Sequence, residues 1–279
     1  MKISTSRREL IGGVAAAFAG ANVSFAAPVT NDDAGFKLGV ASYSFRKLSR
    51  ADAIKGLQAL NVRYVNIKDF HAPMKSTPEE LKQIRSEFES AGIQILGVGN
   101  VSFAKSDDAE MRRNFEYAKA LGAPVIVMAP VHEKLPAIEK LVKEYNIKAA
   151  IHNHGPEDKH FPAPSDVLKA VKNMDQRMGL CVDIGHTTRT GVDVVQSIKE
   201  AGPRLHDMHV KDLSDLMNKD SQVAVGDGAM PIPAIFRQLQ RMGFKGGVML
   251  EYEVHADNPL PGMQKSFSYM RGVLAGMKS

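Results

Sequence analysis

The chain has 279 residues, of which 44 % are hydrophobic and 24 % are charged, and this composition suits one sizeable globular domain. Its formal charge is +5. The first 26 residues contain three basic residues, Lys2, Arg7 and Arg8, and one acidic residue, Glu9, so the remaining residues carry 33 basic and 30 acidic groups. A nearly neutral body without a long basic run disfavours a protein that tracks nucleic-acid phosphates. Cys181 is the only cysteine, so the fold must rest on its core without an intramolecular disulfide.

The first 26 residues have the pattern of an export signal. Ser6-Arg7-Arg8-Glu9 precedes a mildly apolar stretch rich in Ala and Gly, and Ser24-Phe25-Ala26 supplies small residues before a cleavage point. The pattern resembles a twin-arginine signal. The apolar stretch is too short and Gly-rich for a bilayer span of about 20 residues, although an uncleaved amphipathic tail or membrane anchor stays open. We expect a signal peptide over 1–26, a linker over 27–35 and export to the periplasm.

From residue 36 onward, short runs rich in Val and Ile alternate with helix-period stretches, which is typical of parallel strands covered by helices. Eight strands are expected, over residues 36–45, 62–69, 93–101, 123–129, 147–153, 178–184, 205–211 and 246–252. Eight units favour a closed barrel over an open doubly wound sheet, which would also need a Gly-rich phosphate loop after its first strand. We therefore predict an α/β protein in which residues 36–279 form a single (β/α)8 TIM barrel.

Helix boundaries carry their own signals. Ser49, Thr77 and Ser165 are expected to start helices, and Thr77-Pro78-Glu79-Glu80 has capping-box spacing with Pro at the first helical position. Six Gly or Asn residues stand where a left-handed residue ends a helix. They are Asn61, Gly92, Gly122, Asn146, Gly202 and Gly243.

Four of the later strand-like runs end in a side chain that binds metals: His152, Asp183, His209 and Glu251. A closed barrel brings the carboxyl ends of its strands onto one rim, so distance along the chain does not keep these residues apart. Imidazole nitrogen mixed with carboxylate oxygen suits a divalent transition ion. Each residue taken alone could also be an ordinary surface residue or a hydrogen-bonded core residue. The four residues together favour a metal site.

Strand parity places further side chains on the same rim. Residues two positions beyond a ligand share its face, so His154, Lys211 and Glu253 are expected to contact substrate or the ligands. The expected substrate contacts are Lys68, His186, Lys211 and Tyr43. Lys68 could instead extend to solvent, and Tyr43, with Phe45, could belong to barrel packing. His206 has the opposite parity to His209, which favours structural burial, and Cys181 is expected to line the barrel.

The segments HNHG, CVDIGHT, HDMHVKD and LEYE, with VGDGAMPIPAIFRQL between the last two, resemble the xylose isomerase-like TIM-barrel family of sugar phosphate isomerases and epimerases. The resemblance covers nearly the whole mature chain. It implies one divalent ion, often manganese, cobalt or zinc, held by a Glu, an Asp, a His and a final Glu. Asp183, His209 and Glu251 match that pattern, whereas the strand-five Glu-Asn-His appears here as His152-Asn153-His154.

The resemblance implies a sugar isomerase or epimerase that removes a proton next to the carbonyl of a keto sugar, with Glu251 or His154 as base. Replacement of the strand-five Glu by His152 makes epimerisation between two carboxylates less natural. Family members with a similar His-Asn-His-Gly segment and an export signal are associated with keto-glycosides, so a lyase that cleaves 3-keto-glycosides by β-elimination is the alternative.

Two other classes stay open. An abasic-site endonuclease of the same superfamily is disfavoured by the nearly neutral charge and by too few additional metal ligands, and a noncatalytic sugar-binding barrel would lack proton-transfer groups. The expected partner is a small carbohydrate, with no nucleic acid, no membrane span in the mature chain and a possible homo-oligomer. The connection over 212–230 is the longest and could close over substrate.

Overall fold

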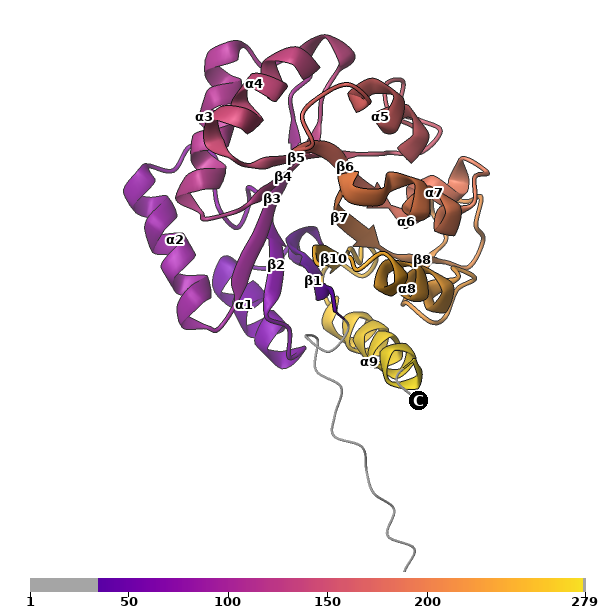
Figure 1. Ribbon diagram of the computed structural model, residues 1–279. Coiled ribbons are helices and arrows are strands. Elements are labelled where there is room, and N and C mark those ends of the chain that lie inside the picture. Colours follow the sequence, from indigo (N-terminus) through magenta and orange to yellow (C-terminus); the bar gives the residue numbers. More distant parts are fainter. Residues whose placement is uncertain (1–34, 278–279) are drawn as a thin grey trace, which may run out of the picture.

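Residues 35–277 of the computed structural model form a closed barrel of eight parallel strands surrounded by helices (Figure 1). The single (β/α)8 barrel is thus confirmed. Around the ring the order is β1-β10-β7-β6-β5-β4-β3-β2, and β1 closes the ring by pairing with both β2 and β10. The barrel strands are β1 (Lys37–Ala41), β2 (Tyr64–Ile67), β3 (Gln94–Ser102), β4 (Val125–Ala129), β5 (Lys148–His152), β6 (Met178–Asp183), β7 (Leu205–Val210) and β10 (Gly247–Leu250).

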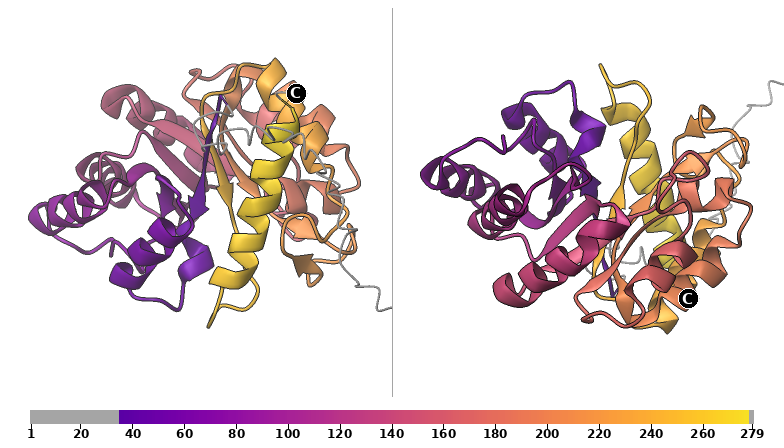
Figure 2. Two further views of the ribbon diagram at one scale, coloured as in Figure 1. Left: turned by 90° about the horizontal axis from the view of Figure 1, so that it is seen from below. Right: turned by 90° about the horizontal axis from the view of Figure 1, so that it is seen from above.

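The helices form the outer ring, and α9 runs along the outside of the barrel beside β1 (Figure 2). They are α1 (Arg50–Ala59), α2 (Pro78–Ser90), α3 (Asp108–Ala120), α4 (Leu135–Tyr145), α5 (Pro164–Val171), α6 (Ile184–Arg189), α7 (Val194–Ala201), α8 (Ile232–Arg241) and α9 (Leu260–Gly276). Across residues 35–277, none of them combines the length and apolar character that crossing a bilayer demands. The signal peptide and most of the linker predicted for the N-terminus lie outside the described residues and stay predictions.

Most helix boundaries match their sequence signals. The Ser49 hydroxyl accepts from the Asp52 N–H at 3.1 Å, and Thr77 and Glu80 form the reciprocal capping box. All six predicted helix ends have a positive φ, between 51° at Asn61 and Gly202 and 74° at Gly92. The expected start at Ser165 is wrong. Helix α5 begins at Pro164, because the Asp166 carboxylate accepts from the Ala163 N–H at 3.1 Å and fixes the cap two residues earlier.

The first strand is shorter than the predicted range of 36–45. It ends at Ala41, and Ser42–Phe45 turn into a 3₁₀ helix. The Ser42 hydroxyl accepts from the Lys68 N–H and the Ser44 hydroxyl accepts from the Tyr252 N–H, each at 2.8 Å. Serine side chains thereby take over hydrogen bonds that a longer ladder would have made. Phe45 is fully buried in the core, so its role is packing.

The inside of the barrel is packed by small and medium side chains. Val125, Val127, Ala150 and Cys181 form one buried cluster there, as expected for Cys181. The main core lies between the strands and the helices and contains the largest buried side chains, including eight phenylalanines. Because side chains fill its interior, the barrel is not a pore. In this fold, binding and catalytic sites lie at the ends of the barrel.

The long connection over 212–230 is anchored to the barrel. It contains a small antiparallel pair, β8 (Asp212–Leu213) and β9 (Gln222–Val223). The Asp212 carboxylate accepts from the backbone N–H groups of Gly226, Gly228 and Met230 at 2.8–3.2 Å. The Gln222 amide donates to the Glu251 carbonyl at 2.7 Å and accepts from the Glu253 N–H at 2.8 Å.

His206 predicts an acid-dependent loss of stability. Its Nε2 lies 3.1 Å from the Gln176 carbonyl oxygen, and burial, aided by the charge of Lys148, lowers its pKa to about 4. The unfolded value is about 6.5. Between these values the unfolded chain binds a proton that the folded chain does not, so stability falls as the pH falls from about 6.5 to about 4. His206→Gln keeps a donor toward Gln176 and should remove about 2–3 kcal/mol of that loss.

The measurement is urea unfolding of wild type and His206→Gln at pH 7 and pH 4.5. Equal losses of unfolding free energy for the two proteins over this range would show that His206 does not carry the effect.

Candidate metal centre

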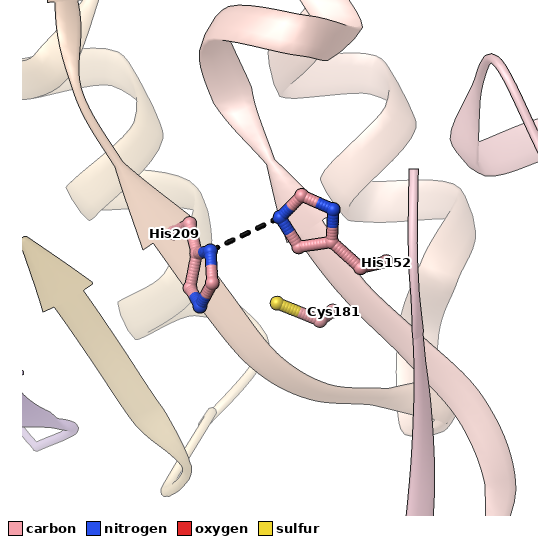
Figure 3. A group of neighbouring side chains, drawn as sticks. All are labelled: His152, Cys181 and His209. Atoms are coloured by element: carbon pink, nitrogen blue, oxygen red, sulfur yellow. Dashed lines mark hydrogen bonds between the residues drawn. The ribbon is translucent and has the colours of Figure 1, made fainter. Parts of the chain in front are cut away.

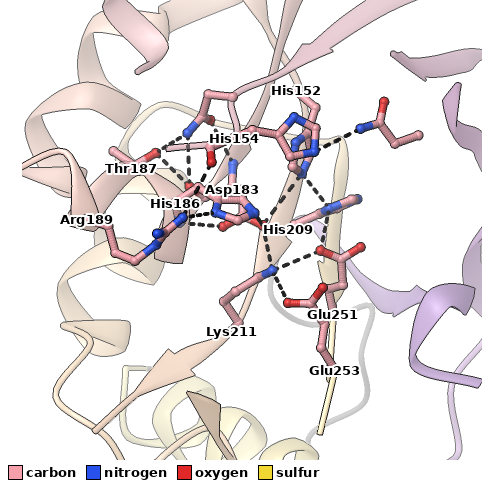
Figure 4. Close-up of polar contacts among 12 residues, drawn as sticks. His152, His154, Asp183, His186, Thr187, Arg189, His209, Lys211, Glu251 and Glu253 are labelled. Carbon is pink, nitrogen blue, oxygen red and sulfur yellow. Dashed lines mark hydrogen bonds and ion pairs between the residues drawn. The ribbon is translucent and has the colours of Figure 1, made fainter. Parts of the chain in front are cut away.

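The four predicted ligands converge at the carboxyl-terminal end of the barrel (Figure 4). His152, Asp183, His209 and Glu251 each offer a ligand atom, and these atoms all lie within 4.8 Å of one another. His152 and Asp183 end β5 and β6, and Glu251 directly follows β10. Parallel register sets Asp183 beside His209, and the β10–β7 pairing places Glu251 one residue beyond the Leu250–Val210 pair.

Two imidazole nitrogens and two carboxylate oxygens face the middle of this group. His152 Nε2 lies 3.0 Å from His209 Nδ1 (Figure 3), 3.6 Å from Asp183 Oδ2, and His209 Nδ1 lies 3.2 Å from Glu251 Oε2. Asp183 Oδ2 is buried, and the Lys211 ammonium lies 3.0 Å from it as an ion-pair partner. A buried carboxylate oxygen that already attracts one cation and faces two imidazoles is suited to a cation site. The residues present therefore fit a divalent ion.

Cys181 also lies near the imidazoles of His152 and His209 and forms with them a second possible ligand set (Figure 3). Complete burial, reinforced by Asp207 and Asp183, raises the pKa of the thiol well above its ordinary value. Metals bind the thiolate, which this position disfavours. The set with Asp183 and Glu251 is the better cation site.

Charge controls the protonation of the ligands. Burial alone would raise the pKa of Asp183, but His186 and Lys211 outweigh it and hold the pKa well below the usual range. Burial would also raise the pKa of Glu251, but His209 and Lys211 outweigh this effect and keep the pKa well below its ordinary value. Burial also lowers the pKa of His152 well below its ordinary value, so this imidazole is neutral. Ionised carboxylates and a neutral imidazole are the forms that bind a metal. His209 differs: Glu251 outweighs burial and raises the pKa of this imidazole, so metal binding there displaces a proton.

The two predicted lysines flank Glu251. Lys211 Nζ lies 3.0 Å from Asp183 Oδ2, 3.0 Å from Glu251 Oε2 and 2.8 Å from Glu253 Oε2. Lys68 Nζ lies 4.0 Å from Glu251 Oε1 and 5.4 Å from the centre of the Tyr43 ring. Both lysines are buried, so Lys68 does not extend to solvent, and Tyr43 lies at the rim as predicted.

His154 lies beside the ligands, with its ring centre 4.3 Å from that of His152. Its Nε2 lies 3.2 Å from Asn100 Nδ2 and its Nδ1 lies 3.6 Å from Asp158 Oδ2. Burial lowers its pKa below 6.5, so the ring is neutral at pH 7. A neutral imidazole with a carboxylate at Nδ1 is suited to accept a proton at Nε2.

Arg189 fixes the state of His186. Arg189 Nη2 lies 2.9 Å from His186 Nδ1, and a guanidinium only donates, so that nitrogen must accept. The neutral ring then carries its proton on Nε2, which lies 3.9 Å from Asp183 Oδ2. Burial lowers the pKa of His186, in agreement with a neutral ring. Glu157 holds Arg189 through two ion-pair contacts of 2.6 and 2.8 Å.

All the predicted site residues meet at this rim, and several partners were missed by sequence reasoning. They are Asn100, Glu157, Asp158, Arg189 and Asp207. Of these, only Asp207 could have been found from strand parity, because it lies two residues before His209. Its carboxylate is buried in the barrel and accepts from Asn66 Nδ2 at 2.8 Å, and burial raises its pKa to about 6. Asn100 lies in β3 at a shift of register between Val98 and Val101, and Glu157, Asp158 and Arg189 reach the site from a loop and a helix. Strand periodicity reports neither feature.

The protein is thus a (β/α)8 barrel that gathers two imidazoles and two carboxylates at its carboxyl-terminal rim. Residues 53–273 match the Xylose isomerase-like TIM barrel family, and the chain belongs to that family.

Individual relatives are distant. Over 135 residues the chain is 26 % identical to the rhizopine catabolism protein MocC of Rhizobium meliloti, a match that spans 43 % of this chain and 41 % of that protein. An uncharacterised protein of Parabacteroides distasonis has a similar structure, with 26 % identity, a TM-score of 0.67 and coverage of 85 % of this chain and 99 % of that one. The 3-keto-D-glucoside 4-epimerase YcjR of E. coli shares the fold at 13 % identity, with a TM-score of 0.71 and coverage of 85 % and 99 %.

The Arg189 contact predicts the tautomer of His186. Two-bond ¹H–¹⁵N spectra of the metal-free protein should show the His186 proton on Nε2, because Arg189 occupies Nδ1. In Arg189→Met this constraint is lost, and the ring should populate both tautomers. Glu157→Gln is the matched control, since it leaves the guanidinium and should leave the tautomer unchanged. A wild-type ring protonated on Nδ1 contradicts the assignment.

Proposed function

We propose that this protein is a divalent-metal-dependent enzyme of the sugar isomerase and epimerase type, which removes a proton next to the carbonyl of a keto sugar. The observation that carries the proposal is the convergence of His152, Asp183, His209 and Glu251 within 4.8 Å, with proton-transfer groups directly beside them. Membership of the Xylose isomerase-like family supports a sugar substrate.

A bound divalent ion supplies Lewis-acid polarisation of a carbonyl, which makes the neighbouring C–H more acidic. The four residues above are the ones that would hold it, and the donor set fits manganese, cobalt or zinc. Around them the chain places two lysines, Lys68 and Lys211, whose charges favour negative charge developing on substrate oxygens.

His154 is the better base of the two predicted candidates. Glu251 belongs to the ligand group, and its strongly lowered pKa makes it a weak base. His154 stands outside that group and is neutral, and because the Asn100 amide donates to its Nε2 at 3.2 Å, the ring proton is on Nδ1, 3.6 Å from Asp158. In the proposed step, His154 Nε2 takes the proton from the carbon next to the ketone, and the C–H electron pair enters the enediolate. Delivery of that proton to the former carbonyl carbon, with transfer of the hydroxyl proton to the other oxygen, completes isomerisation. Epimerisation instead requires a proton from a second donor on the opposite face.

A second candidate is a lyase that cleaves 3-keto-glycosides. His152 replaces the carboxylate that would face Glu251, so the site favours a proton-transfer group on one side of the substrate. In β-elimination, loss of the C2 proton to His154 forms a C1–C2 double bond, and the electron pair of the C1–O bond leaves with the aglycone. The E. coli neighbour is named for a 3-keto-glucoside, which favours testing this substrate class.

The proposed partner is therefore a small carbohydrate, and nucleic acid is disfavoured. The rim has a neutral His154 and a neutral His186 aimed at the site, which a noncatalytic sugar-binding barrel would not need. Solvent hydrogen exchange separates the two classes, because binding alone exchanges no substrate proton.

The direct test is NMR of the Mn²⁺-, Co²⁺- or Zn²⁺-reconstituted protein with free ketoses and 3-keto-glycosides in D₂O, using Zn²⁺ where paramagnetism broadens the signals. Deuterium incorporation next to the carbonyl with stereochemical inversion or ketose–aldose conversion supports the isomerase and epimerase reading. Release of aglycone supports the lyase. If no substrate of either class exchanges a proton, the enzymatic proposal fails.

Two histidine variants separate metal binding from proton transfer. His152→Ala removes a ligand and should lose stoichiometric metal together with turnover. His154→Gln should retain the metal but lower the exchange rate by roughly 10²–10⁴-fold, the usual contribution of general acid–base catalysis. Metal content by mass spectrometry and exchange by NMR check both results. Full metal retention in His152→Ala would remove that residue from the ligand set.

A further inference from the structure

Lys211 is a buried cation at the centre of the acidic group. Its ammonium lies 3.0 Å from an oxygen of Asp183 and 3.0 Å from an oxygen of Glu251, both of them proposed metal ligands. The side chain is 4 % exposed, so water contributes little to its solvation. These are the same oxygens, Asp183 Oδ2 and Glu251 Oε2, that face His152 Nε2 and His209 Nδ1.

The path of the Lys211 side chain is built into the fold. Gly185, the second residue of α6, lies against it, and a Cβ at position 185 would lie 2.7 Å from Lys211 Cγ and 2.8 Å from its Cδ. Any larger residue there would displace the chain that carries the ammonium. On the far side Glu253, which is 38 % exposed, holds the ammonium at 2.8 Å. The lysine therefore reaches the carboxylates by a fixed route.

Lys68 provides a comparison within the same site. Its ammonium lies 4.0 Å from Glu251 Oε1. Among residues 35–277 its one ion pair is with Glu251, so it does not link the two carboxylates. In this described part of the chain, only Lys211 bridges Asp183 and Glu251.

We propose that Lys211 is a built-in substitute for the metal ion: it holds Asp183 and Glu251 together in the metal-free protein and weakens the hold of the site on a divalent ion. The inference rests on the proposed metal centre. Two like-charged cations that share the same pair of oxygens repel each other over a few ångströms, and a low-dielectric site strengthens that repulsion. The lysine would thereby keep the metal exchangeable and the empty site folded.

The test is titration calorimetry with Mn²⁺ alone, together with thermal unfolding with and without Mn²⁺, on metal-stripped wild type, Lys211→Met and Lys68→Met. Lys211→Met should bind Mn²⁺ at least tenfold more tightly than wild type, because the competing charge is gone. Without metal it should melt at a lower temperature than wild type, and Mn²⁺ should raise its melting temperature by more. Lys68→Met, the matched control, should change affinity less than Lys211→Met.

Unchanged or weaker Mn²⁺ binding by Lys211→Met, with normal binding by wild type, overturns the inference and leaves the metal centre standing. Absence of Mn²⁺, Co²⁺ and Zn²⁺ binding by wild type overturns the metal centre itself, and the inference with it. If Lys211→Met does not fold even with metal, Lys211→Gln, which keeps a polar end group, takes its place with the same expected gain in affinity.

Discussion

Two carboxylates enclosed away from water govern the carboxyl-terminal end of this barrel. Asp183 is fully buried and Glu251 is 5 % exposed, and removing a carboxylate from water costs several kcal/mol unless charge and hydrogen bonds offset it. The chain surrounds them with one bridging ammonium and two imidazoles. Lys211 lies 3.0 Å from both carboxylates and offsets part of that cost, and the imidazole nitrogens of His152 and His209 face the same oxygens.

The features that follow from strand geometry could be predicted from the sequence. His152, Asp183, His209 and Glu251 were separable from other polar residues because each ends an apolar run, and parallel pairing carries such ends to one rim. Parity likewise placed Lys211 beside His209. Left-handed Asn and Gly residues marked the ends of the helices, since few other residues adopt that conformation at low cost.

The remaining partners depend on three-dimensional geometry that periodicity does not encode. Arg189 reaches His186 from within one short helix, and Asp158 approaches His154 from a loop whose path the sequence does not fix. Serines shortened the first strand because a hydroxyl can replace a ladder partner, and Asp166 outcompeted Ser165 as the residue that fixes a helix start. In the last two cases, a side chain competed with the backbone for hydrogen bonds.

The β8–β9 connection affects how a ligand reaches this end of the barrel. The Asp212 carboxylate accepts hydrogen bonds from three backbone amides. The side-chain amide of Gln222 forms hydrogen bonds with the backbone on both sides of Tyr252. A ligand that enters along this side, such as the proposed sugar, would meet an edge that is already ordered, so the entropy of ordering it would not reduce the affinity. Selectivity along this edge would then depend on the shape and polarity of the ligand.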